Sequence, residues 1–145
     1  MGVVLAFDFG TQRIGVAVGN TTLCSAQPLL TIAAEKAQTR FAAIADLIET
    51  WQPVLVVVGL PLQADGGEQE TTRRSRRFAR QLQGRFGIEV VLVDERGTTL
   101  AARVDLNAAG VRGSKQKPLL DKIAAQHILQ AYFDQRFHAD VKNEK

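Results

Sequence analysis

The chain begins with two short runs of strand-forming residues, Val3-Val4-Leu5-Ala6-Phe7-Asp8-Phe9 and Ile14-Gly15-Val16-Ala17-Val18. The connection between them, Gly10-Thr11-Gln12-Arg13, is short and contains a glycine, which is typical of a β-hairpin. A third strand is predicted between Ser25 and Ile32. Pro28 restricts this strand to a sheet edge or a bulge, because proline cannot donate a hydrogen bond to a neighbouring strand. The N-terminal part of the chain therefore predicts an antiparallel sheet.

The pattern then changes to alternating helices and strands. Apolar residues recur at helical spacing from Phe41 to Trp51, and Pro53 ends this helix. The run Val54-Leu55-Val56-Val57-Val58-Gly59-Leu60 is apolar without alternation, which is typical of a parallel strand covered on both faces. The remaining elements expected are a helix from about Glu68 to Gly84 or Gly87, a buried strand over Glu89–Val93, a helix from Thr98 or Thr99 to about Ala109, a mobile loop over Val111–Lys117 and a last helix from Pro118.

This order of elements predicts an α/β sandwich. Strand–helix–strand units within one sheet have right-handed crossovers and parallel strands. We therefore expect a mixed five-stranded sheet whose first three strands are antiparallel and whose fourth and fifth are parallel, with helices on both faces. A chain of 145 residues, 46% of them hydrophobic, suits one domain. We assign this domain to residues 1–138 and expect the polar residues 139–145 to form a disordered tail.

Several classes of protein are disfavoured by composition. The longest apolar runs fall far short of the roughly 20 residues that span a bilayer. No Lys or Arg precedes the first apolar run, so a signal peptide is not expected and the cytoplasm is the expected compartment. Cys24 is the only cysteine, which excludes an internal disulfide and a cysteine-based zinc cluster.

The basic residues are unevenly distributed. The chain has 18 Lys+Arg against 15 Asp+Glu, a net charge of only +3. Six arginines nevertheless lie between Arg73 and Arg85, and a second basic cluster runs from Arg112 to Lys122. On a helix, Arg73, Arg76, Arg77 and Arg80 would share a sector of about 100°. This distribution favours a surface that contacts nucleic acid.

Three acidic residues lie where a charge is costly. Asp8 ends an otherwise apolar strand, Glu95 follows another, and Asp121 begins an apolar helix beside small alanines. Ligands collect at the carboxyl ends of strands in α/β sheets, and alanines would let the last helix approach the sheet, so we expect these carboxylates to converge. Oxygen ligands select Mg²⁺ or Mn²⁺. Two such ions together can activate a water and stabilise the departing oxygen of a phosphodiester.

Each acid also has a structural interpretation, because Asp and Glu at strand ends are common turn formers and helix caps. Asp94, next to Glu95, is an alternative candidate for the acid that this strand contributes to the site. Neighbouring residues in a strand point to opposite faces, so only one of the two acids faces the other carboxylates.

Four segments carry a resemblance to a known family. They are Asp8-Phe9-Gly10-Thr11-Gln12-Arg13-Ile14-Gly15-Val16-Ala17, Val58-Gly59-Leu60-Pro61-Leu62 with Asp65-Gly66, Asp94-Glu95-Arg96-Gly97-Thr98-Thr99, and Asp121-Lys122-Ile123-Ala124-Ala125. In this order and spacing they resemble the YqgF family, also called RuvX, over residues 1 to about 137. The resemblance implies an RNase H-like three-layer fold related to RuvC resolvases. It also implies a metal-dependent nuclease that matures the 5′ end of the small-subunit ribosomal RNA.

The resemblance implies that Asp8, Glu95 and Asp121 are both the catalytic acids and the metal ligands. Gly97 departs from the family, which usually has a larger residue there, and this bears on loop packing rather than on the metal ligands. The residues assigned to substrate contact are Arg13, Arg96 and Thr98 within the motifs, and Arg73, Arg77, Arg80, Lys115 and Lys117 outside them.

Other functions are compatible with these residues. The same site would suit a Holliday junction resolvase acting on DNA, for which a homodimer is expected because two symmetric strands are cut; the sequence leaves monomer and homodimer open. Asp-x-Gly-Thr hairpins also begin sugar kinases and actin-like ATPases, but those proteins hold a nucleotide between two lobes and this chain supplies one. A non-catalytic RNA-binding factor for ribosome maturation is a further alternative. RNA and DNA are not distinguished, because cationic contacts to a phosphate backbone serve either.

Overall fold

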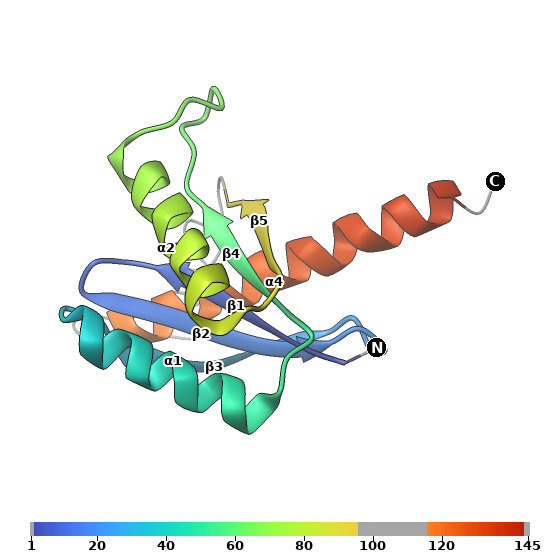
Figure 1. Cartoon of the computed structure of the whole chain (residues 1–145). Helices are drawn as coiled ribbons and strands as arrows, with labels where there is room; N and C mark the ends of the chain where they lie inside the picture. Colours follow the sequence, from blue (N-terminus) through green and yellow to red (C-terminus); the bar gives the residue numbers. More distant parts are fainter. Residues whose placement is uncertain (1, 96–115, 144–145) are drawn as a thin grey trace.

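The computed structural model describes residues 2–95 and 116–143, with the side chains of 116, 117 and 137–143 outside that description. Five strands form one sheet in the order β3-β2-β1-β4-β5 (Figure 1). The antiparallel pairs are β1 with β2 and β2 with β3, and the parallel pairs are β1 with β4 and β4 with β5. The strands are β1 (Val3–Phe9), β2 (Arg13–Asn20), β3 (Ala26–Ala33), β4 (Leu55–Leu60) and β5 (Val90–Asp94). The predicted mixed sheet is confirmed.

The β1–β2 hairpin and the edge strand follow the sequence prediction closely. β1 and β2 pair in register from Val3 opposite Asn20 to Phe9 opposite Ile14, so only a tight turn is left between them. β3 lies at the edge of the sheet, and its register with β2 shifts at Val16/Ala17. Pro28 lies opposite Ala17 at this shift, which agrees with its predicted restriction to a sheet edge or a bulge.

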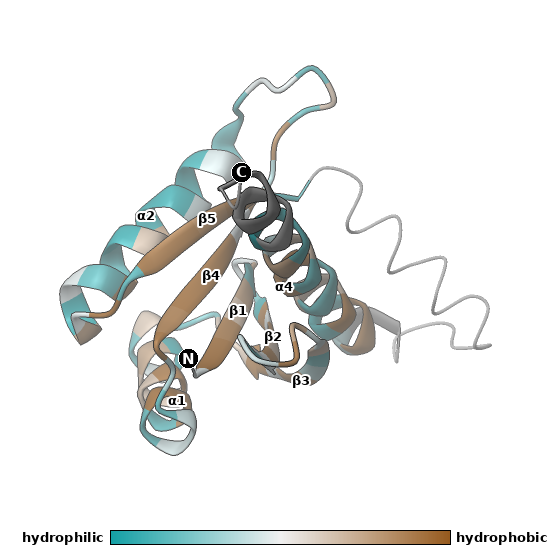
Figure 2. Ribbon diagram, turned by 90° about the vertical axis from the view of Figure 1, so that its right-hand side faces the viewer, coloured by the Kyte–Doolittle hydropathy of each residue, from teal (hydrophilic) through white to brown (hydrophobic). Residues whose placement is uncertain are grey.

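Helices cover both faces of the sheet (Figure 2). Helices α1 (Ala37–Trp51) and α2 (Glu70–Phe86) pack on one face, and α4 (Gln116–Asn143) packs on the other. The predicted helix between Thr98 and Ala109 and most of the loop predicted after it lie outside the described residues. The last helix continues to Asn143, past the point at which we expected a tail to begin, and the division of the chain at residue 138 stays a prediction.

Alternation along β1 separates the core into two halves. Leu5 and Phe7 belong to the cluster under α1 and α2, whereas Val4 and Ala6 belong to the cluster under α4. Successive side chains in a strand point to opposite faces. Asp8 therefore points to the face that α4 covers. Within the described residues no helix combines the length and the apolar character needed to cross a membrane.

Two glycines allow α4 to lie close against the sheet. A Cβ atom on Gly15 would overlap with the backbone carbonyl of Asp121 and lie 2.9 Å from the amide nitrogen of Lys122. A Cβ atom on Gly59 would overlap with the side chains of Glu95 and Ile128. A glycine inside a strand often marks such a close approach. The N-terminal half of α4 is thus held near the carboxyl ends of β1 and β5.

We predict that Gly15→Ala destabilises the protein by roughly 1–3 kcal/mol, the usual range when extra atoms are forced into a packed interior. The backbone of α4, rather than a flexible side chain, would have to move. Gly84→Ala is the matched control, because nothing lies within 4 Å of the added Cβ. It lies within α2 and should be neutral or stabilise by up to about 1 kcal/mol. Urea denaturation measures both; equal stability of the two variants would contradict the close approach.

Candidate active site

Asp8 lines a pocket beside the β1–β2 turn. The pocket has a volume of about 300 Å³. Its lining residues are Asp8, Phe9, Gly10, Thr11, Gln12, Arg13 and Asp121, and we call it the acidic pocket. One wall is thus the hairpin turn, and the opposite wall is the start of α4. The structure therefore brings together two of the three acids that the sequence singled out.

Glu95 is held against Asp8 by the neighbouring strand. Its backbone N–H donates to the carbonyl oxygen of Leu60 at 3.2 Å, which extends the pairing of β5 with β4 by one residue. Its side chain lies over Gly59 and shares a hydrogen bond with the carboxyl group of Asp8. Val91 and Val93 also pack on the α4 side, so alternation places Glu95 there and leaves Asp94 exposed on the other side.

Asp121 is held by an ion pair across the acidic pocket. The Arg13 Nε–H donates to the Asp121 Oδ2 at 2.7 Å, and the two side chains are 35% and 21% exposed. The start of α4 is also fixed to the edge strand, because the Thr31 hydroxyl donates to the carbonyl oxygen of Pro118 at 2.6 Å. Arg13 thus contacts an acid of the site, and its contact with substrate stays a prediction.

Burial and mutual repulsion raise the pKa values of the two paired acids. Burial raises the pKa of Asp8 to about 7, the charge of Asp121 adds to this rise, and the hydrogen bond with Glu95 opposes it. Burial raises the pKa of Glu95 to about 9, and the charge of Asp8, the hydrogen bond with Asp8 and the charge of Asp94 act in the same direction. At neutral pH the pair therefore retains a proton, which Glu95 donates to Asp8.

The oxygen donors of this site suit a hard divalent cation, although they do not form a finished ligand set. Among the residues that the structure describes, no group of three His, Cys, Asp or Glu is placed to hold a metal ion. Asp8 and Glu95 contact each other, while Asp121 is engaged by Arg13. The Glu95 Oε2 is buried and has no hydrogen-bond partner. An unpartnered carboxylate oxygen beside a second buried acid is a position where a cation would replace a proton.

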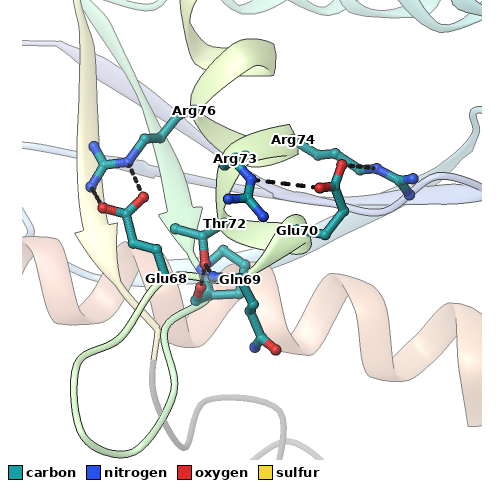
Figure 3. A network of polar contacts seen from close by, with 8 residues as sticks. Glu68, Gln69, Glu70, Thr72, Arg73, Arg74 and Arg76 are labelled. Atoms are coloured by element: carbon teal, nitrogen blue, oxygen red, sulfur yellow. Dashed lines mark hydrogen bonds and ion pairs between the residues drawn. The ribbon is translucent and has the colours of Figure 1, made fainter.

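The basic side chains of α2 differ in how far their charge is already neutralised (Figure 3). Arg76 donates to both carboxylate oxygens of Glu68, at 2.9 and 3.2 Å. Arg73 and Arg74 share Glu70 at 3.5 and 3.3 Å. Arg77 is exposed and has no ion pair within the described part of the chain. Of the other residues predicted to bind substrate, Arg80 is exposed on α2, and Arg96, Thr98 and Lys115, together with the side chain of Lys117, lie outside the described residues.

The start of α2 is fixed to β4 by its capping residues. Gln69 and Thr72 cap the helix reciprocally, and the Gln69 N–H donates to the Thr72 hydroxyl oxygen at 3.1 Å. The same hydroxyl donates to the carbonyl oxygen of Pro61. The arginines that follow on α2 are therefore presented from a rigid helix.

Sequence reasoning missed the part that the two glycines have in forming the site. Gly15 provides space for Asp121, and Gly59 provides space for the Glu95 carboxylate. A glycine within a run of valines, as in Val57-Val58-Gly59, is the local signal that indicates such an approach.

Comparisons with known proteins identify the family of this chain. The family described as "RuvX: Holliday junction resolvase" matches residues 2–135. A relative from Nitrosomonas eutropha is 61% identical over 133 residues, which cover 92% of this chain and 85% of that protein. A relative from Neisseria gonorrhoeae is 48% identical over 133 residues, covering 92% and 88%. Both are named "Putative pre-16S rRNA nuclease".

Solved structures support the fold. RuvC from T. thermophilus, in complex with a Holliday junction substrate, has a TM-score of 0.57 at 16% identity and covers 93% of this chain and 96% of that one. The Fowlpox virus resolvase, in complex with Holliday junction DNA, has a TM-score of 0.59 at 10% identity, covering 92% and 97%. The predicted RNase H-like, RuvC-related architecture is confirmed. From its sequence over nearly the whole length and from its fold, this chain belongs to the RuvX family.

Proposed function

We propose that this protein is a metal-dependent endonuclease that hydrolyses phosphodiester bonds in structured nucleic acid, and that its task is the 5′-end processing of pre-16S rRNA in the cytoplasm. The observation that carries the proposal is the buried Asp8–Glu95 carboxyl pair, with its unpartnered Glu95 Oε2, beside a pocket lined by Asp121. The names of relatives that are 48–61% identical to this chain support the choice of substrate.

The chemistry follows from the donor set. Asp8, Glu95 and Asp121 would hold Mg²⁺ or Mn²⁺, because carboxylate oxygens without His or Cys suit hard cations. One or two such ions, when bound, activate water and stabilise the departing oxygen of a phosphodiester. Arg13 keeps the Asp121 carboxylate oriented within the pocket. A guanidinium has five N–H donors, so Arg13 is able to contact a phosphate oxygen while it holds Asp121.

A second candidate function is resolution of DNA four-way junctions. It is favoured by the description of the matching family and by the fold shared with two resolvases that were solved with junction DNA. Such an enzyme is expected to act as a homodimer, because it cuts two symmetric strands. A monomer suffices for cleavage at one end of a precursor RNA. Substrate preference and oligomeric state therefore test the two functions together.

We predict that Asp8→Asn lowers Mn²⁺-dependent cleavage of a labelled pre-16S rRNA by roughly two orders of magnitude or more, the scale of losing one preorganised charged group. The variant should stay folded, because the amide is neutral and Asp8 is already buried beside another acid. Asp46→Asn, at an exposed position of α1, is the control with the same change of charge.

A four-way DNA junction assayed in parallel separates the two candidate functions. Cleavage by Asp8→Asn at the wild-type rate would contradict the assignment, and binding without any cleavage would favour a non-catalytic RNA-binding factor.

We also predict that the metal-free protein loses stability as the pH rises. Both acids have a higher pKa in the folded than in the unfolded state, so the folded state binds more protons above about pH 4.5. The free energy of unfolding should then fall by roughly a few kcal/mol toward pH 9. Mn²⁺ should raise the Tm more at pH 8 than at pH 6, because its ligands must be deprotonated.

Thermal unfolding in EDTA and in Mn²⁺, across this pH range, measures both effects. Asp8→Asn should flatten the pH dependence, since one of the two titrating groups is removed. A wild-type protein whose stability in EDTA rises steadily from pH 5 to pH 9 would contradict the raised pKa values.

A further inference from the structure

A second pocket lies directly beside the acidic pocket and shares Phe9 and Thr11 with it. It has a volume of about 270 Å³. Its walls come from the end of β1, the hairpin turn, the first turn of α1 and one side of α2. The residues that matter here are Phe9, Thr11, Arg40, Arg74, Arg77 and Gln81, and we call this the arginine pocket.

The arginine pocket concentrates positive charge. Three of its lining residues are arginines and none is acidic. Arg74, Arg77 and Gln81 are spaced so that they lie on one side of α2. Arg77 is exposed and has no ion pair within the described residues. Arg74 pairs with Glu70, but both side chains are more than half exposed, and such pairs contribute little.

Arg40 is held in a fixed orientation without losing its charge. Its Nε–H and Nη2–H donate to the carbonyl oxygen of Ala34, at 3.2 and 2.8 Å. Its guanidinium carbon also lies 5.3 Å from the centre of the Phe9 ring and 5.9 Å from that of Phe41. These partners are neutral, so the cation remains uncompensated. A side chain that is already ordered loses less entropy when it binds a ligand.

We propose that the arginine pocket binds one phosphodiester group of the nucleic-acid strand whose scissile bond lies in the acidic pocket. This inference rests on the proposed function. Guanidinium groups present planar, paired N–H donors that match phosphate oxygens. Phe9 and Thr11 line both pockets, so the pockets adjoin at the hairpin turn and one strand that crosses the turn is able to reach both.

The test removes phosphate charges one at a time. A fluorescent single-stranded oligonucleotide from the 5′ region of pre-16S rRNA is prepared in versions that each carry one neutral methylphosphonate. Binding is measured by anisotropy in EDTA, which prevents cleavage. Wild-type protein should bind one of these versions roughly tenfold more weakly than the others, as expected for the loss of one charge-assisted contact. The double variant Arg74→Gln/Arg77→Gln should bind the unmodified strand more weakly than the wild type does. No single methylphosphonate position should weaken its binding more than the others.

Arg85→Gln is the control, because it removes one positive charge from the same helix, where the double variant removes two. Arg85 lies outside the pocket, with its guanidinium carbon 4.0 Å from the centre of the Phe41 ring. This variant should retain the wild-type penalty at the one sensitive position. The slope of log affinity against log salt concentration should also fall by about one phosphate contact in the double variant, and by less in the control. Circular dichroism checks that the exposed substitutions leave the fold intact.

The outcomes separate failure of this inference from failure of the proposed function. The arginine pocket is not a phosphate subsite if the double variant still binds the same methylphosphonate version most weakly, or if its affinity for every version falls by the same factor. The Asp8→Asn assay still decides whether the protein cleaves.

Inorganic phosphate serves as a second probe, titrated while the Tm is followed. If the wild type binds phosphate through Arg74 and Arg77 but binds no nucleic acid, both the phosphodiester inference and the proposed function are overturned. If Arg85→Gln abolishes the sensitive position as the double variant does, general charge rather than this pocket is responsible.

Discussion

The close approach of α4 to the sheet is the constraint on which the acidic pocket depends. Backbone atoms of Asp121 lie where a side chain at position 15 would be, and Glu95 lies where a side chain at position 59 would be. Burial of Ile128 and other apolar residues of α4 stabilises this arrangement. The same packing forces acids into proximity, and the raised pKa values of Asp8 and Glu95 are the electrostatic cost. A site of this kind is stable only because the rest of the domain holds it together.

Much of the fold could be predicted because local patterns determine it. The hairpin, the edge strand with Pro28 and the buried strand over Leu55–Leu60 each follow from a period or from one residue's covalent limits. The choice between Asp94 and Glu95 needed one further fact, namely which side of β5 meets α4. Once Val91 and Val93 are known to pack there, alternation along the strand settles it.

The details of the site could not be predicted, because they depend on contacts between distant parts of the chain. The Arg13–Asp121 ion pair joins residues separated by 108 positions, and no local pattern indicates it. Arg40 is an ordinary surface position in the helical pattern, yet it meets residues from β1 and α2 in one pocket. The sequence led us to expect three converging carboxylates. The structure pairs Asp8 with Glu95 and places Asp121 in the same pocket as Asp8, where Arg13 is its ion-pair partner.

The hairpin turn separates the two pockets, and its length has a mechanical consequence. β1 and β2 are paired up to Phe9 and Ile14, so the turn between them is short and cannot extend further. With a phosphodiester group bound in the arginine pocket and the scissile bond in the acidic pocket, as proposed above, this turn would fix the distance between the two. The number of nucleotides between the bound phosphate and the cleaved bond would then be set by the length of the turn rather than by recognition of bases.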